Sequence, residues 1–475
     1  MFTLFLFGVF SVFKAPTDPD FGWHYKYGEY IAQHGKILRE NIYYHTFIDY
    51  KWANSYWISQ VAVYLTHRYL GHLIAGLLFA SVLSLSAIFY VRAVEKYSRP
   101  IILLSTLATV LLFVEFSGSG VAGRPMYFST LFLMFLVVVL MNDSRKKLLV
   151  LPLLFLVWAN THADFILGLF ILGLYVGGKI IGNARKAFLL AVSGILSVAI
   201  TLINPYGLGL WETLIKESHP YQFSYISEWV PASVDNLHYF VVYCVVLGLM
   251  VSALIGARHK LPPWYVLALG FFCIAAVRSQ YFFRVAVILG IPAFVTFWAG
   301  PLVELRNALS QQLTKKTKSG FLAFLFLSTL ATGTVFLTDV SQCVDSRYWV
   351  EKQRYPEEAL NFALANKIEG NVFNYYGWGG YMIWKYPQVK TFVDGRMPSW
   401  REGNISVFED YIKLVTFPKK NIDVLDDYRV AWVLYPTDSE LVKYLRTAGS
   451  GWKEMYSDDF ATVFVETTMF DIITP

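Results

Sequence analysis

The chain has 475 residues, of which 56% are hydrophobic and 16% are charged, and its mean hydropathy is +0.45. This composition excludes an ordinary soluble globular protein and indicates a polytopic membrane protein. The net charge of +6 does not indicate a nucleic-acid partner, because Lys and Arg fall in short clusters between apolar segments. Cys244, Cys273 and Cys343 are widely spaced and predict neither a disulfide framework nor a thiolate metal site.

The apolar segments predict about eleven membrane-spanning helices. Several are shorter than the roughly 20 residues that cross a bilayer core, so we expect some to extend into flanking aromatic residues and some to be broken or re-entrant. No small-residue cleavage pattern closes the first segment, which predicts a retained anchor. The segments lie at residues 1–14, 72–92, 101–117, 126–141, 148–158, 163–179, 187–203, 238–257, 262–277, 285–300 and 321–338.

The basic clusters predict the orientation of this helical domain, residues 1–338. With a cytoplasmic N-terminus, each cluster between helices falls on the cytoplasmic side, as the distribution of Lys and Arg in membrane proteins requires. We therefore expect a multi-pass protein of the cell (inner or plasma) membrane, with residues 339–475 outside. The clusters are at Arg92 to Arg99, Arg145 to Lys147, Lys179 to Lys186, Arg258 to Lys260 and Arg306 to Lys318.

Acidic, histidine and arginine side chains are then left together on the outer side. A transporter would instead place ionisable groups near the midplane, on interrupted helices in repeated halves, and no internal repeat is visible. The outer segments are the loop 15–71 with Asp18, Asp20 and His24, the turn with Arg124, the turn with His162 and Asp164, the loop 204–237 with Glu228, and the turn with Arg278 and Arg284.

The first outer loop begins with two carboxylates separated by Pro19, whose fixed φ predicts an extended, turn-like pair. Taken alone, this Asp-Pro-Asp would be an ordinary interfacial loop, where Trp and Tyr are expected in any case. The stretch 52–70 has apolar residues at helical spacing and predicts an amphipathic helix in the plane of the interface.

Residues 339–475 change in composition and predict a small α/β domain. Residues 356–366 have acids in a first turn and a glycine beyond the end, which predicts a helix. Residues 371–376 and 429–435 predict strands. The GWGG run at 377–380 and the sequence Asp394-Gly395-Arg396 predict a backbone bend and a tight turn, with substrate recognition as the alternative for each.

Together these features resemble the C-type (GT-C) membrane glycosyltransferases that use polyprenyl-phosphate sugars. The stretches DPDFGWHYKYGEYI, AGRPMYF, WANTHADFILG, NPYG, ISEW, NYYGWGGYMIW and FVDGR are similar to a bacterial group of membrane proteins related to those enzymes. The run 356–381 also resembles the entry to the outer domain of the oligosaccharyltransferase catalytic subunit, whose WWDYG motif would align near Tyr375 to Gly379. The Asp of that motif is absent, so recognition of a sequon hydroxyl is not implied.

Sugar transfer from a lipid phosphate needs a carboxylate that accepts a proton or holds a cation, and cationic groups beside the leaving phosphate. We predict Asp18, Asp20 and His24 as catalytic residues. Oxygen ligands from Asp18, Asp20 and Asp164 would favour Mg²⁺ or Mn²⁺. The residues predicted to contact substrate are Arg124, His162, Glu228, Arg278, Arg284, Trp378 and Arg396.

The expected partners are a polyprenyl-phosphate-linked sugar donor, the lipid bilayer, and a glycan, lipid or protein acceptor. Two other classes remain open on the sequence. One is a non-catalytic receptor or assembly factor on the same scaffold, which would not need the acids beside the cations. The other is a transporter of the lipid-linked sugar, which would need a polar path through the helices.

Overall fold

A computed structural model describes the chain except for residues 1, 14, 16–17, 96–101, 119–123, 143, 218–225, 227, 309–310, 345–354, 404 and 468–475. The chain divides into two compact units. The first unit contains residues 1–15, 66–210 and 222–341, and the second contains residues 16–65, 211–221 and 342–475. Most of the predicted outer loop 15–71 therefore belongs to the same unit as the C-terminal domain.

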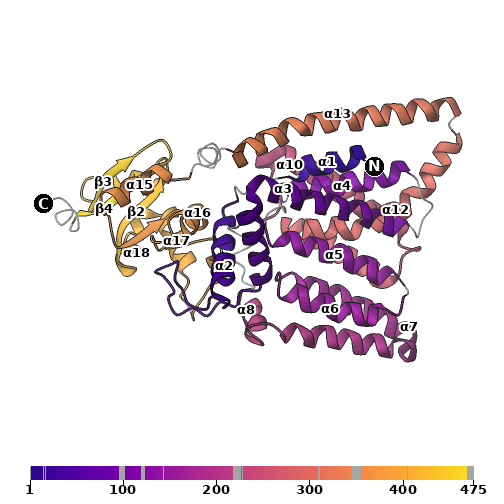
Figure 1. The fold of residues 1–475 in the computed structure, drawn as a ribbon, viewed down its shortest axis with the longest axis horizontal. Helices are drawn as coiled ribbons and strands as arrows, with labels where there is room; N and C mark the ends of the chain where they lie inside the picture. Colours follow the sequence, from indigo (N-terminus) through magenta and orange to yellow (C-terminus); the bar gives the residue numbers. More distant parts are fainter. Residues whose placement is uncertain are drawn as a thin grey trace. The chain divides into compact units, whose positions relative to one another are not determined.

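The first unit is helical (Figure 1). In it α12 packs against α4, α10 and α11, while α6 packs against α5 and α7. Its helices are α1 (Phe2–Val12), the larger part of α3 (Trp57–Glu95), α4 (Ile102–Gly118), α5 (Met126–Met141), α6 (Lys147–Ala159), α7 (Phe165–Ala199), α10 (Leu237–Ala257), α11 (Pro263–Arg278), α12 (Phe283–Ala308) and α13 (Gln311–Val344).

Ten of the described helical segments are apolar, and four of them are long enough to cross a membrane. The four are Trp57–Glu95, Phe165–Arg185, Val234–Ala257 and Gln280–Pro301. The other six are apolar but shorter. The structure therefore supports a membrane protein, but it does not confirm the predicted number of about eleven spanning helices.

Two of the helical elements are each interrupted by non-helical backbone. Helix α3 begins at Trp57 and continues through Glu95 across a kink at Gly71, where φ is 75°. The helix predicted at 52–70 is thus its first part. Helix α7 is interrupted at Asn183, where the backbone is non-helical, between the predicted segments 163–179 and 187–203. In both cases the interruption lies between two segments that the sequence predicts as separate helices.

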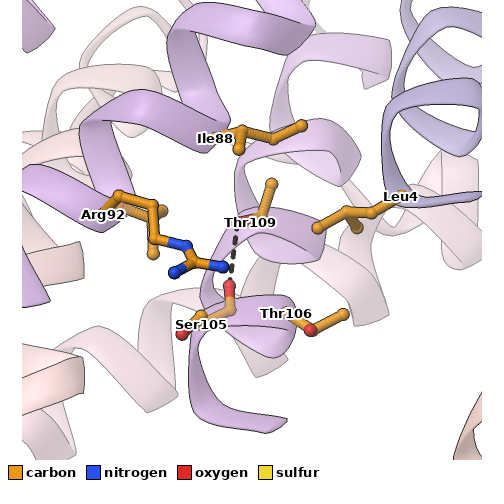
Figure 2. A pocket seen from close by; sticks show the side chains of 7 residues that line it. Leu4, Ile88, Arg92, Ser105, Thr106 and Thr109 are labelled. Atoms are coloured by element: carbon orange, nitrogen blue, oxygen red, sulfur yellow. Dashed lines mark hydrogen bonds between the residues drawn. The ribbon is translucent and has the colours of Figure 1, made fainter. Parts of the chain in front are cut away.

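A small cavity of about 20 Å³ lies between α1, α3 and α4, and Figure 2 shows its lining. Thr109 Oγ1 donates a hydrogen bond to the carbonyl of Ser105 at 2.8 Å, one turn away on α4. The volume suits about one water molecule. This cavity is therefore too small for a sugar donor. Its lining residues are Leu4, Ile88, Val91, Arg92, Ser105, Thr106 and Thr109.

The second unit contains a four-stranded mixed sheet of order β1-β2-β4-β3. Strand β1 (Asn371–Asn374) pairs in parallel with β2 (Val430–Pro436), and β4 (Ala461–Glu466) pairs antiparallel with both β2 and β3 (Trp452–Ser457). Figure 1 shows helices beside these strands. They include α15 (Glu357–Ala365), α16 (Gly379–Lys385), α17 (Val407–Thr416), α18 (Asp423–Asp427) and α19 (Glu440–Leu445). The predicted helix at 356–366 and both predicted strands are confirmed.

The first outer loop is part of this second unit. Helix α2 (Phe21–His34) packs against α16. Tyr44 forms an isolated parallel bridge with Thr391, and Thr46 Oγ1 donates to the carbonyl of Phe392 at 2.7 Å. Trp23, Tyr27 and Tyr44 are buried in the same core as residues of β1 and β2. Apolar burial and main-chain hydrogen bonds thus fasten residues 21–52 to the C-terminal domain.

His45 makes this unit sensitive to acid. Its Nε2 lies 2.9 Å from the carbonyl oxygen of Val372 on β1, and burial lowers the pKa of His45 below its ordinary value of 6.5. Below about pH 6.5 the unfolded chain binds a proton here that the folded chain does not, so the free energy of unfolding falls as the pH falls. One proton accounts for at most about 1.4 kcal/mol per pH unit.

We expect the thermal midpoint of the wild type to fall more between pH 7 and pH 5 than that of His45→Gln, which has an amide donor but no titrating ring. The matched control is His34→Gln at an exposed position of α2. This control should follow the wild type. Equal pH dependence in His45→Gln and the wild type would contradict the assignment.

Candidate functional site

Asp164 and Arg284 form a buried ion pair in the first unit. Asp164 precedes the first turn of α7, and its Oδ2 lies 2.6 Å from a terminal nitrogen of Arg284 on α12. The guanidinium also donates to the Met126 carbonyl and to Thr130 Oγ1, each at 3.2 Å. Tyr281 donates its hydroxyl hydrogen to Asp164 Oδ1. Both oxygens of Asp164 therefore have fixed partners.

His162 lies in the same turn, between α6 and α7, and is buried. The backbone N–H of Asp164 donates to His162 Nδ1 at 3.1 Å. Burial lowers the pKa of His162 to about 4, against the opposing effects of Asp164 and Glu228. His162 is consequently neutral at pH 7, with Nδ1 as the acceptor, so the 3.4 Å approach of Nδ1 to Asp164 Oδ2 is not an ion pair.

The charges beside it give Asp164 the opposite protonation behaviour. Burial alone would raise the pKa of this carboxyl, but the Arg284 charge and the hydrogen bonds from Arg284 and the Tyr281 hydroxyl lower it below its ordinary value. Asp164 is therefore ionised at neutral pH and is balanced by Arg284.

Arg124 and Glu228 form a second ion pair in the first unit. Arg124 lies just before α5, and the Glu228 side chain is 39% exposed, so this pair contacts water where Asp164–Arg284 does not. The next residue, Trp229, stacks on the Tyr281 ring with centroids 4.1 Å apart and an angle of 11° between the planes. Tyr281 thus connects the two ion pairs.

The sequence predicts that the outer turns lie close together, and within the first unit four of them do. The turns with Arg124, with His162 and Asp164, with Glu228, and with Arg284 lie in one network. Arg278, the last residue of α11, is exposed and has no hydrogen bond or ion pair to these residues within the described part of the chain.

Asp18 and Asp20 lie in the second unit, in the turn before α2. Asp18 Oδ1 accepts a hydrogen bond from the Asp20 N–H at 2.8 Å, and Asp20 Oδ1 accepts one from Trp23 Nε1 at 3.0 Å. Both carboxylates are half-buried. The predicted turn is correct, but the helix that starts one residue later was not predicted.

The other predicted residues of this unit lie in its interior. His24 is buried on α2, with Nδ1 3.3 Å from Gln60 Nε2. Trp378, in the 3-10 turn before α16, is buried in the core beside Leu360 and Val372. The guanidinium of Arg396 binds Asp394 and the Tyr27 hydroxyl. Burial would lower the pKa of Arg396, but Asp394 and Tyr27 raise it above its ordinary value.

Among the described residues, no three His, Cys, Asp or Glu side chains are grouped as a metal site. Asp18 and Asp20 supply two carboxylates from one turn, which fits the oxygen ligands that Mg²⁺ and Mn²⁺ prefer. The Asp164 carboxylate already binds a guanidinium and a phenol hydroxyl.

Sequence analysis did not identify Tyr281 or the aromatic residues around Arg396. Tyr281 stands three residues before Arg284, a spacing that places both on one side of a helical stretch. That spacing could have indicated a shared contact. Trp23, Tyr27, Tyr44, Trp52 and Trp400, which surround Arg396, have no common local pattern.

No protein-family model matches the sequence, and no curated protein sequence matches it. Solved structures, however, match its fold. The oligosaccharyltransferase AglB from Archaeoglobus fulgidus, in complex with an inhibitory peptide and a dolichol-phosphate, superposes with a TM-score of 0.58 and 9% identity, over 96% of this chain and 70% of AglB. The A. fulgidus oligosaccharyltransferase tethered to an acceptor peptide with the NVT sequon gives 0.57 and 10%, over 98% and 73%. The chain therefore has the fold of the archaeal oligosaccharyltransferase, a GT-C enzyme to which it is distantly similar.

Proposed function

We propose that the protein is an integral membrane glycosyltransferase. It transfers a hexosyl or pentosyl group from a polyprenyl-phosphate-linked donor to a glycan, lipid or protein acceptor at the outer face of the cell membrane. The observation that supports this most is the network of Arg124, Glu228, Asp164 and Arg284 on a fold shared with AglB. The dolichol-phosphate bound to AglB supports a lipid phosphate as the donor's carrier.

In this proposal the N-terminus is cytoplasmic and residues 339–475 are outside. The helical domain 1–338 binds the lipid-linked donor, and the first outer loop contributes Asp18 and Asp20. The basic clusters of the sequence support this orientation, since Lys and Arg are enriched in cytoplasmic loops.

The two arginines of the network have different tasks. Arg124 is paired with a carboxylate that is 39% exposed, so a phosphate can replace Glu228 with little loss of hydrogen bonding. Arg284 is buried, and breaking its contact would leave Asp164 as an isolated buried charge. We therefore assign phosphate binding to Arg124, with the exposed Arg278 as a second cation, and assign Arg284 to holding Asp164 in place.

The transfer step requires a base for the acceptor. The acceptor's nucleophilic atom forms a bond to the anomeric carbon of the sugar, and the bond from that carbon to the phosphate oxygen breaks. The electron pair of the broken bond stays on the lipid phosphate, and the acceptor's proton passes to the carboxylate of Asp18 or Asp20. A Mg²⁺ or Mn²⁺ ion held by these aspartates would offset phosphate charge. The backbone N–H of His24 on α2 donates to the Asp20 carbonyl at 3.3 Å and so supports the turn.

Donor binding tests the proposal through Arg124. Polyprenyl phosphate added to the purified protein in detergent can be counted by native mass spectrometry. Arg124→Gln should weaken its affinity about tenfold, since a hydrogen bond to a charged group contributes about 1.5 kcal/mol or more. Glu228→Gln should strengthen it, because the competing carboxylate is removed.

Arg258→Gln is the matched control, because Arg258 lies beyond the end of α10 and, among the described residues, bonds only locally, to the carbonyl of Ile255 at 3.0 Å. It should bind polyprenyl phosphate as the wild type does. Unchanged affinity in Arg124→Gln, together with unchanged affinity in Glu228→Gln, would remove this pair from the donor site.

A further inference from the structure

Three glycines let the Asp18–Asp20 turn approach the C-terminal part of the second unit at backbone distance. A Cβ atom on Gly395 would lie 1.8 Å from Asp20 Oδ1. A Cβ on Gly380 would lie 1.9 Å from the carbonyl oxygen of Pro19, and one on Gly22 would lie 1.9 Å from the carbonyl oxygen of Gly380. At Gly22 and Gly380 the nearest atoms belong to the backbone, so glycine is required there. At Gly395 the nearest atoms belong to the Asp20 side chain, which can move.

The turn that contains Gly395 is rigidly built. The Arg396 N–H and its Nε both donate to Asp394 Oδ1, at 3.0 and 2.7 Å, and the Met397 N–H donates to the Asp394 carbonyl at 3.1 Å. Aromatic rings enclose the guanidinium, with centroids between 5.0 and 5.7 Å from its central carbon. They belong to Trp23, Tyr27, Tyr44, Trp52 and Trp400.

Trp23 connects this cage to the carboxylate. Its ring faces the Arg396 guanidinium at 5.6 Å, and its Nε1 donates to Asp20 Oδ1 at 3.0 Å. Asp20 Oδ1 therefore has the Gly395 backbone on one side and a fixed indole donor on another. Gly395 belongs to the Asp394–Arg396 turn, and the Trp23 ring packs against Arg396 of the same turn.

We propose that the Asp394–Arg396 turn is a positioning element that sets the location of the Asp20 carboxylate. The proposal rests on the proposed function, in which the Asp18–Asp20 pair takes part in transfer. In this arrangement the Asp394–Arg396 turn of the C-terminal domain holds the Asp18–Asp20 turn in its position. Arg396 acts through Trp23 and Gly395 and does not touch substrate.

Gly395→Ala separates positioning from folding. The atom nearest to the added methyl group is the end of the Asp20 side chain, so the carboxylate can move while the backbone stays in place. Gly380→Ala would instead press on the backbone oxygen of Pro19 and disturb the fold. A displacement of about 1 Å at a reacting group can reduce a rate by about a hundredfold.

The experiment measures turnover of a polyprenyl-phosphate-linked sugar, donor KM, bound polyprenyl phosphate per chain and thermal midpoint. Gly395→Ala should lose at least about tenfold in turnover, with donor KM and bound lipid phosphate per chain as in the wild type. The control is Gly248→Ala on α10, an exposed glycine with no atom within 4 Å of an added Cβ. It should retain full turnover.

A second variant applies if Gly395→Ala does not fold. Trp23→Phe keeps a ring in the cage but removes the hydrogen bond to Asp20, and it should also lose turnover without loss of bound lipid phosphate. Wild-type turnover in Gly395→Ala or in a folded Trp23→Phe, when Asp20→Asn is inactive, would overturn the positioning role and leave the proposed function standing. Full turnover in both Asp18→Asn and Asp20→Asn would instead contradict the proposed function.

Discussion

Arg396→Met is expected to lower the free energy of unfolding of the second unit by about 3–5 kcal/mol. The guanidinium and the Asp394 carboxylate are both almost completely buried, and each is the other's ionic partner. Methionine fills much of the same space but leaves Asp394 as an uncompensated charge in the interior. It also leaves the buried Tyr27 hydroxyl without its contact to Arg396.

The thermal midpoint of unfolding in detergent is measured by tryptophan fluorescence. Two further variants show whether loss of the buried ion pair causes the change in thermal midpoint. Arg396→Met with Asp394→Asn removes both charges and should recover part of the loss. Lys413→Met breaks the solvent-facing Lys413–Asp410 pair, whose lysine side chain is 55% exposed, and should change stability by no more than about 1 kcal/mol. An Arg396→Met midpoint equal to that of Lys413→Met would show that the buried pair does not stabilise the unit.

We expect Asp18→Asn or Asp20→Asn to reduce turnover by about a hundredfold or more. The loss should occur at the position that serves as the base or cation ligand. Asparagine keeps the size of aspartate and an oxygen that can accept from the Asp20 N–H or from Trp23 Nε1, so the turn should stay folded. It has no negative charge and cannot take the acceptor's proton. Because both carboxylates are half-buried and partly solvated, stability should change by only about 0.5 kcal/mol.

Several elements were predictable from local patterns. The helix α15 has acids in its first turn, and β1 and β2 are β-branched and aromatic runs, so their type follows from short stretches. The network of Arg124, Asp164, Glu228 and Arg284 followed from a different argument. Alternation of basic loops placed their turns on one side of the membrane.

Other features depend on contacts that local patterns do not contain. Helix α2 was missed because Asp-Pro-Asp was interpreted only as a turn, although a proline and an aspartate just before a helix are also a start signal. The cage around Arg396 unites residues from Trp23 to Trp400, and only the folded chain brings them together.

The proposed role of the Asp18–Asp20 turn in sugar transfer from a lipid phosphate can be tested by the initial rate of sugar release from a labelled polyprenyl-phosphate donor. Wild-type protein, Asp18→Asn and Asp20→Asn are compared in detergent with a defined acceptor, at equal amounts of folded protein. We expect transfer by the wild type and a loss of about a hundredfold in at least one Asn variant. Wild-type rates in both variants would contradict that role.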